Sequence, residues 1–439
     1  MKKHLLIGLL ITLTFKGFSQ NLNTPRLDSL FQVFDKKDKF MGSIAVTQNG
    51  KLLYSKAIGY ADIETGQKVN TLSKYRIGSI SKMFTATLIL MAVEKNKITL
   101  NQTLDRYFPQ IENAKKITIE NLLNHRSGIH SFTSDAGYSD YMDQYKSREA
   151  MLKIIVDGKS DFEPNSKATY SNSNYVLLSY IAEDIYKSKY ADILDKQVIK
   201  PLKLKNTYFG SKTNLQNNEA YSYQFTGAKW IKEKETDTSI PMGAGGIVSN
   251  PQDLNTFISQ LFAGKLITMK SLELMKTMNQ KFGLGIFQIP YYDKINYGHN
   301  GAIDGFNSIL IYNPEEKLSV AITSNGTQYP LNNVLIAALS AWFEKPFKVP
   351  TFEEVNVSPD ILESYAGQYS SKQIPIKISI TKTGDKLFAQ ATGQSAFPLE
   401  AASSTTFKYD QAGIVLEFNA VKKEMILKQA GKEFLFTKE

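Results

Sequence analysis

Cysteine is absent from this chain of 439 residues, and histidine is scarce. Without cysteine the chain can form no disulfide, thiol nucleophile, thiolate metal site or lipid-modified N-terminal cysteine. The histidines are His4, His125, His130 and His299, and no two of them have the HExxH spacing of a helix-borne zinc site. We therefore expect no histidine-built metal site, and the chemistry that we derive below needs neither a metal nor a cofactor.

Long apolar segments are also missing, except for a short run near the N-terminus. Residues 5–13 are apolar, follow a short basic start and precede the small residues Gly17 and Ser19. This arrangement is typical of a cleavable secretory signal over residues 1–19, because the run is too short to span a bilayer. No later segment approaches about 18 uninterrupted apolar residues. We therefore expect a mature chain that is periplasmic or secreted and has no transmembrane anchor.

The chain carries a formal net charge of +10, which by itself would suit an anionic partner. The basic residues are scattered, however, and alternate with acids, as at residues 36–39 and 232–235. No nucleic-acid-binding motif accompanies them, so we predict no nucleic-acid partner.

The pattern of strands and helices predicts an α+β fold. Strands are expected at residues 43–47, 52–58, 282–289, 308–312 and 319–323, and helices at 27–34, 79–95, 119–124, 175–186 and 254–262. Asn49-Gly50 joins the first two strands and is a strong hairpin signal. Strands at both ends and helices in the middle indicate an antiparallel sheet with flanking helices and a helical insertion.

A second unit is expected at the C-terminus. Residues 345–360 hold three prolines and little periodicity, which predicts a linker between a domain at 20–344 and a domain at 361–439. The last segment alternates as short strands throughout, at 374–380, 386–391, 415–418, 425–428 and 433–437. Such a pattern predicts a small all-β barrel or sandwich.

Ser79 and Lys82 are the first candidates for chemistry. They stand three residues apart at the start of an apolar helix, so their side chains share one face. A lysine desolvated by apolar neighbours has a lowered pKa and can take the serine proton. The helix N-terminus also offers N–H groups to a developing oxyanion.

The same Ser-x-x-Lys pattern recurs at Ser379 and Lys382, where it overlaps Lys-Thr-Gly. Ser379 lies in an alternating strand, in which residues three apart face opposite ways. Gly384-Asp385 follows as a hairpin signal. We therefore interpret the second match as an ordinary turn.

Two further motifs make the first match specific. Tyr170-Ser171-Asn172 precedes a helix, and His299-Asn300-Gly301 stands at the head of a strand pair, where Gly301 would let a substrate backbone approach edge-on. In this order the three motifs resemble the serine penicillin-recognising superfamily, in particular its class C β-lactamase, D-alanyl-D-alanine carboxypeptidase and esterase branch. LLNHRSGI, GAGGIVSNPQDL and YGHNGAIDGF are similar too. The resemblance covers about residues 24–345, and the C-terminal segment looks like the β-rich tail of such hydrolases.

The resemblance implies a β-lactamase/transpeptidase-like fold and a role for each motif residue. Ser79 would be the acylated nucleophile, Lys82 and Tyr170 would share general-base and general-acid work, and His299 would lie opposite Lys82 and tune the Tyr170 proton. Asn172 would hold the substrate's amide or ester side chain. The backbone N–H groups of Ser79 and Ala302 would form the oxyanion hole.

The resemblance also bears on specificity. Ala302 stands where many β-lactamases and carboxypeptidases carry Ser or Thr, and His299 replaces the lactamases' lysine. Both differences argue against β-lactams and C-terminal peptides as substrates. We expect a serine hydrolase acting on a small-molecule or peptide ester or amide. A true β-lactamase or D,D-carboxypeptidase and a non-catalytic ligand-binding module are the alternatives.

Other residues that suggest chemistry have simpler interpretations. We expect His125 and His130 to be structural or surface residues. Gly243-Ala244-Gly245-Gly246 lacks the spacing of a dinucleotide site, so we read it as a tight turn.

Overall fold

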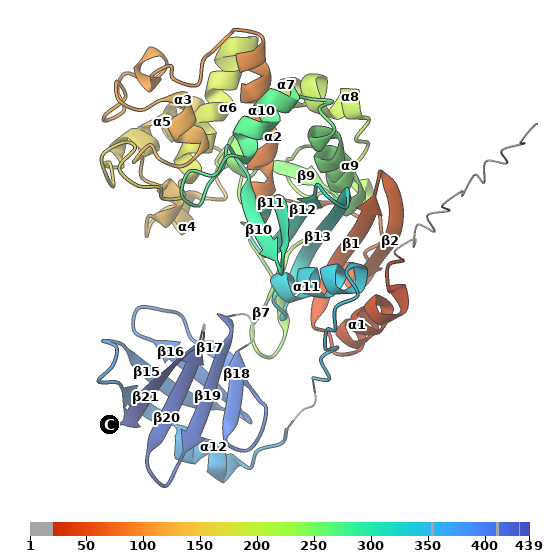
Figure 1. Cartoon of the computed structure of the whole chain (residues 1–439). Coiled ribbons are helices and arrows are strands. Elements are labelled where there is room, and N and C mark those ends of the chain that lie inside the picture. The colour runs from red at the N-terminus through yellow and green to blue at the C-terminus, as the bar shows by residue number, and fades with distance from the viewer. Residues whose placement is uncertain (1–20, 353–354, 410–411, 430) are drawn as a thin grey trace, which may run out of the picture.

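The computed structural model describes residues 21–352, 355–409, 412–429 and 431–439 (Figure 1). The signal predicted for residues 1–19 lies outside these ranges. The described chain combines an antiparallel sheet and helices with a closed β-barrel, so the predicted α+β fold class and C-terminal barrel are confirmed. Within these ranges no helix is both long and apolar enough to cross a membrane.

The central sheet is built from strands at both ends of the first unit. They are β1 (Phe40–Gln48), β2 (Lys51–Ile58), β10 (Phe287–Tyr291), β11 (Lys294–Ile303), β12 (Phe306–Asn313) and β13 (Leu318–Thr327). All pairs are antiparallel, in the order β10-β11-β12-β13-β1-β2. Asn49-Gly50 forms the predicted hairpin turn between β1 and β2.

Helices cover both faces of this sheet (Figure 1). α1 (Thr24–Lys36) and α11 (Leu331–Trp342) pack on one face, and α2 (Ser81–Glu94) and α9 (Pro251–Phe262) on the other. The insertion between β2 and β10 also contains α3 (Ile119–Leu123), α4 (Tyr138–Tyr141), α5 (Arg148–Asp157), α6 (Asn172–Tyr186), α7 (Tyr190–Leu194), α8 (Lys200–Leu202) and α10 (Met269–Lys276). Side chains of β12 alternate accordingly, with Ile309 and Ile311 in the core under α1 and α11, and Leu310 and Tyr312 in the core with α2 and α9.

The first unit also contains several short strands and turns. They are β3 (Tyr60–Asp62), β4 (Gln67–Lys68), β5 (Tyr75–Arg76), β6 (Tyr208–Phe209), β7 (Tyr223–Phe225), β8 (Trp230–Lys232), β9 (Ile247–Ser249) and the 3₁₀ turns η1 (Gly78–Ile80) and η6 (Met242–Ala244). β5 and β6 flank β9, which fixes the chain on either side of the turn that leads into α2.

Several predicted boundaries differ from the observed ones by a few residues, and two of these differences have a clear local reason. The helix expected from residue 175 begins at Asn172, in a polar first turn that gives no apolar signal. The strand expected from residue 282 begins at Phe287. Before it the chain passes tightly over α2 and α6: a Cβ on Gly285, which has φ +77°, would lie 2.7 Å from Ala86.

The C-terminal strands close into an eight-stranded barrel with its own apolar core. They are β14 (Gly367–Ser370), β15 (Lys377–Thr383), β16 (Lys386–Ala391), β17 (Phe397–Ala401), β18 (Thr406–Tyr409), β19 (Ile414–Asn419), β20 (Glu424–Gln429) and β21 (Lys432–Lys438), preceded by α12 (Pro359–Tyr365). Ser379 and Lys382 lie on β15, and Gly384, with φ +63°, is in the predicted hairpin turn.

In the described part of the segment expected to be a linker, no helix or strand precedes α12, but several side chains are packed. Phe347, Val349 and Phe352 pack against the core beneath the sheet, and α12 begins at Pro359. The barrel also touches the first unit: Glu400 pairs with Lys39, and the Lys386 ammonium donates to the carbonyl of Gly227, in the turn of the β7–β8 hairpin. In Figure 1 this hairpin reaches from the sheet toward the barrel.

Candidate active site

Ser79 lies in the η1 turn at the N-terminus of α2 and is partly exposed. The turn packs on the end of β11. Gly78 has φ +50°, and a Cβ there would come within 2.8 Å of the Ala302 nitrogen. Only glycine fits this conformation and this contact without strain. The backbone of the serine turn therefore lies directly against that of Ala302.

Lys82 is fully buried one turn further along α2. Its Nζ lies 3.0 Å from Ser79 Oγ, 2.7 Å from Asn172 Oδ1 and 2.7 Å from the carbonyl oxygen of Ala244. Burial holds the pKa of the Lys82 ammonium well below its usual range. The structure thus brings Ser79, Lys82 and Asn172 together as the motif order predicts.

Tyr170 packs beside this group. The Lys82 Nζ lies 4.9 Å from the centroid of its ring. Burial raises the pKa of the Tyr170 phenol, and a hydrogen bond with Ser79 partly offsets that rise. The phenol is therefore protonated at neutral pH and can give a proton to a neighbouring atom.

His299 is buried on β11, with its ring centroid 6.2 Å from that of Tyr170 and 4.3 Å from that of Phe287. Burial is the main cause that lowers the pKa of His299 to about 3. Its Nδ1 contacts the carbonyl oxygen of Asn300, which can only accept, so the imidazole is neutral with its proton on Nδ1.

Asn172 begins α6, and both ends of its side-chain amide are engaged. Oδ1 accepts from Lys82, and Nδ2 donates to Thr133 Oγ1 at 2.9 Å. Its backbone N–H donates to Ser131 Oγ at 3.0 Å. Asn172 therefore holds Lys82 in place, and because its NH₂ group has a second N–H, the substrate contact that the motif suggested stays a prediction. The hydroxyls of Ser131 and Thr133 had no signal in the sequence beyond their closeness to LLNHRSGI.

The glycine-rich turn contributes to the site through its backbone. η6 contains Ala244, whose carbonyl binds Lys82, and a Cβ on Gly243 would come within 2.5 Å of Thr85 Oγ1. The interpretation as a tight turn is confirmed, but its contact with Lys82 was missed. A backbone carbonyl is present at every residue, so nothing in the sequence marks this one.

His125 is structural, as expected, but it lies inside the site. Its ring centroid is 4.4 Å from that of Tyr170. Its carbonyl accepts from the N–H of Thr169 at 2.9 Å, and its Nδ1 accepts from the N–H of Ser171 at 3.1 Å. His125 thus fixes the backbone on both sides of Tyr170. His130 lies apart, bonded to Asp161 and Asp135.

Gly301 and Ala302 lie near the end of β11. β10 pairs with β11 only as far as Gly298, so in the described chain the edge of residues 299–303 on that side has no strand partner. A Cβ on Gly301 would lie 2.1 Å from the carbonyl oxygen of Ile77. The glycine therefore permits a close approach of the chain to itself, and the edge-on approach of a substrate stays a prediction. The Ala302 side chain is exposed.

Comparison with known proteins gives a consistent picture. The sequence model of the Beta-lactamase family matches residues 27–339. The chain is 29% identical over 298 residues to a teichoic acid D-alanine hydrolase of Staphylococcus aureus, covering 65% of this chain and 71% of that protein.

Two solved structures have a similar fold. A D-amino acid amidase from Ochrobactrum anthropi, complexed with D-phenylalanine, matches with TM-score 0.63 and 24% identity over 73% of this chain and 99% of its own. An octameric penicillin-binding protein homologue from Pyrococcus abyssi matches with TM-score 0.66 and 22% identity over 94% of this chain and 100% of its own. The second match is long enough to include the C-terminal barrel.

Proposed function

This chain belongs to the Beta-lactamase family of serine hydrolases, and from that premise we propose that it cleaves an ester or amide through an acyl-enzyme formed on Ser79. The hydrogen-bond partners of Lys82 are the observation that supports this proposal most directly. A neutral amine has two N–H bonds and one lone pair. The two N–H bonds satisfy Asn172 Oδ1 and the Ala244 carbonyl, which leaves the lone pair for the Ser79 hydroxyl at 3.0 Å. Lys82 is thus arranged as a base.

Acylation follows from this arrangement. Ser79 Oγ attacks the carbonyl carbon while Lys82 takes its proton. The oxyanion accepts hydrogen bonds from the backbone N–H groups of Ser79 and Ala302. Tyr170 gives its phenolic proton to the departing oxygen or nitrogen and regains one from Lys82, so the C–O or C–N bond breaks without a stranded charge. Water then repeats the steps on the acyl-enzyme and releases the acid.

The substrate class follows from what the end of β11 offers. His299 is neutral, and Ala302 has no hydroxyl, so neither residue can bind a carboxylate beside the scissile bond. Relatives with related folds are named for D-alanine and D-amino acid substrates. We therefore assign this chain a D-aminoacyl ester or amide that bears no carboxylate on the leaving group. A β-lactamase or D,D-carboxypeptidase is the second candidate, supported by the shared family alone.

The export and domain assignments belong to the same proposal. Residues 1–19 would be removed on export, residues 20–344 would form the hydrolase, and residues 361–439 would form a separate barrel. N-terminal sequencing of the exported protein tests the first part, with Gln20 as the expected first residue.

The test of the reaction is a burst experiment with p-nitrophenyl acetate. The wild type should release about one equivalent of nitrophenol before slower turnover, because deacylation follows a covalent step. Ser79→Ala should show no burst, whereas Ser379→Ala, with the matching motif in the barrel, should behave as wild type. A burst that survives in Ser79→Ala would refute the assignment, and a wild-type protein that neither releases nitrophenol nor becomes acylated would be a binding module.

The substrate assignment is tested by comparing D-alanyl esters and D-amino acid amides with nitrocefin and D-Ala-D-Ala peptides. We expect higher kcat/KM for the first group. Ala302→Ser should narrow the difference by up to about 1–3 kcal/mol, the range for a hydrogen bond to a charged group. An unchanged ratio in Ala302→Ser would contradict the role given to this position.

A further inference from the structure

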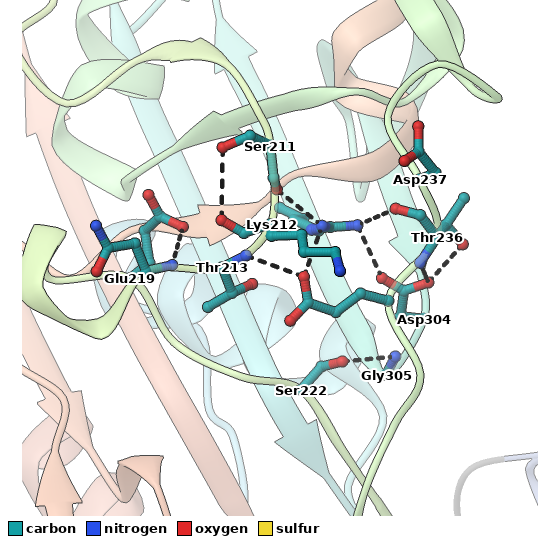
Figure 2. A network of polar contacts seen from close by, with 12 residues as sticks. Ser211, Lys212, Thr213, Glu219, Ser222, Thr236, Asp237, Asp304 and Gly305 are labelled. Carbon is teal, nitrogen blue, oxygen red and sulfur yellow. Dashed lines mark hydrogen bonds and ion pairs between the residues drawn. The ribbon is translucent and has the colours of Figure 1, made fainter. Parts of the chain in front are cut away.

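A buried ion pair lies just behind the serine turn. Arg76, on β5, stands three residues before Ser79, and its side chain is 5% exposed. Its guanidinium reaches Asp304 Oδ2 at 3.3 Å and Glu235 Oε2 at 2.9 Å. It also donates to the carbonyl of Ser211 at 2.9 Å and to that of Thr236 (Figure 2). One side chain thus joins β5 to three other segments.

Asp304 lies in the two-residue turn between β11 and β12, two residues after Ala302. Its side chain is fully buried, and its backbone has φ +53°. Its Oδ1 accepts from the N–H of Thr236 at 3.0 Å and from the Thr236 hydroxyl at 2.6 Å. The next residue, Gly305, donates its N–H to Ser222 Oγ at 3.1 Å. The turn is therefore held from several sides in a conformation that few residues adopt freely.

These contacts connect the two segments that carry the proposed oxyanion donors. Arg76 is fixed to the serine turn through the chain, and Asp304 to Ala302 in the same way. Between the two, the backbones touch directly at Gly78 and Gly301. Ser308, on β12, adds a hydrogen bond of 2.8 Å to the carbonyl of Ile77. An ion pair at this place sets how far apart the two segments can lie.

The pair is better suited to positioning than to stability. A buried ion pair adds little net stability, because the cost of desolvating two charges offsets their attraction. The reaction rate, in contrast, depends strongly on geometry, since a displacement of about 1 Å in a reactive site can lower the rate by about 10²-fold. We propose that Arg76 and Asp304 are positioning residues that set the spacing between the backbone N–H groups of Ser79 and Ala302. The inference rests on the proposed function.

The test compares two aspartates in similar surroundings. Asp304→Asn keeps an acceptor for Thr236 but turns an amide N–H toward Arg76. Asp253→Asn is the control, because Asp253 also accepts from a backbone N–H, that of Asn206, and from a threonine hydroxyl, that of Thr207, at 2.7 and 2.9 Å. It lies on α9 and has no assigned role in the reaction.

Acylation of Asp304→Asn should be about 10- to 100-fold slower with KM nearly unchanged, because the oxyanion donors act in the transition state. Binding of a boronic acid, whose tetrahedral adduct puts an oxygen in the same place, should weaken by the same factor. Asp253→Asn should match wild type in both. Arg76→Lys, which keeps the charge but loses the planar fork, should slow acylation too, and it replaces Asp304→Asn if that variant does not fold.

The inference fails if folded Asp304→Asn or Arg76→Lys acylates at the wild-type rate, or if Asp253→Asn is equally slow. It also fails if KM rises while kcat is unchanged, since that would indicate a role in substrate binding. Each of these results leaves the proposed function intact, provided that wild-type protein is acylated on Ser79. If wild-type protein is not acylated at all, both the proposed function and this inference are wrong.

Discussion

Lys82 is surrounded by groups that determine which protonation state is useful. Two carbonyl oxygens can only accept hydrogen bonds, and the apolar helix around the lysine disfavours its charge. Tyr170 and His299 beside it are both neutral at pH 7, because burial raises the pKa of the Tyr170 phenol and lowers that of the His299 imidazole. Burial likewise lowers the pKa of His125 and raises that of Tyr175, the other titratable side chains near Lys82. At the residue scale, the site is therefore a set of uncharged groups among which one proton moves.

The first prediction concerns the state of Lys82. Lys82→Arg keeps N–H donors for Asn172 and Ala244 but is never deprotonated in a protein. Its acylation rate should fall by about 10²–10⁴-fold at every pH, the usual cost of losing a general base. In the wild type, the rate should rise with pH and level off well below the pKa of a free lysine. A Lys82→Arg variant with near wild-type rate would show that another group is the base.

The second prediction concerns His299 and folding. Its pKa is about 3 in the folded chain and about 6.5 in the unfolded one. Between these values only the unfolded chain binds the proton, so stability is complete above pH 6.5 and is lost as pH falls toward 3. His299→Gln should lose less unfolding free energy than wild type between pH 7 and 4.5, as measured by urea denaturation. Equal losses of unfolding free energy in the two proteins would mean that His299 does not contribute to the pH dependence of stability.

At the scale of elements, the sequence predicts those contacts of the site that side chains make. It does not predict the contacts that backbone atoms make. Ser79 and Lys82 share a helix face, and the spacing alone indicates that they meet. The contact of Ala244 with Lys82 and the contact of Gly78 with Ala302 involve backbone atoms of segments far apart in the chain. Residue types give no indication of such contacts. The polar residues at the start of α6 likewise gave no indication that the helix begins at Asn172.

Gly78 provides the third prediction. Gly78→Ala introduces a side chain at φ +50° and within 2.8 Å of the Ala302 nitrogen, so it should separate the two oxyanion donors. Gly384→Ala, at φ +63° with open space around it, is the matched control. Gly384→Ala should cost about 1–2 kcal/mol of stability through its positive φ, and Gly78→Ala should cost more because its Cβ also meets the Ala302 backbone. Only Gly78→Ala should slow acylation, by about 10-fold or more. Equal rates in the two folded variants, measured by stopped flow, would contradict this role of Gly78.

At the scale of the whole molecule, the barrel has its own core and few polar contacts with the hydrolase unit. Its apolar cluster contains only residues beyond 356. All of the proposed catalytic residues precede it. The chain between the two units also packs on the hydrolase unit, because the Phe352 ring lies tilted against that of Phe34, with centroids 6.0 Å apart. The sequence shows a proline-rich stretch here but cannot show which aromatic side chains are covered.

The fourth prediction follows from this division. A chain that ends at Phe352 keeps the packing on Phe34 and should retain the acylation rate within about three-fold, since the barrel supplies no group to the chemistry. A chain that ends at Glu344 loses that packing and should unfold at a lower temperature. Rates are normalised to folded protein, because removing the barrel uncovers the β7–β8 hairpin. Loss of acylation in the folded longer chain would mean that the barrel takes part in the reaction.

The central claim is that Ser79 carries the acyl group and Lys82 enables its transfer. It is tested most directly by quenching the protein with acid during turnover of a D-alanyl ester and locating the adduct by peptide mass spectrometry. The account predicts one D-alanyl group, on the peptide that contains Ser79, none in Ser79→Ala, and an adduct that forms about 10²–10⁴-fold more slowly in Lys82→Arg. An adduct on any other residue, or an adduct that forms at the wild-type rate in Lys82→Arg, would contradict it.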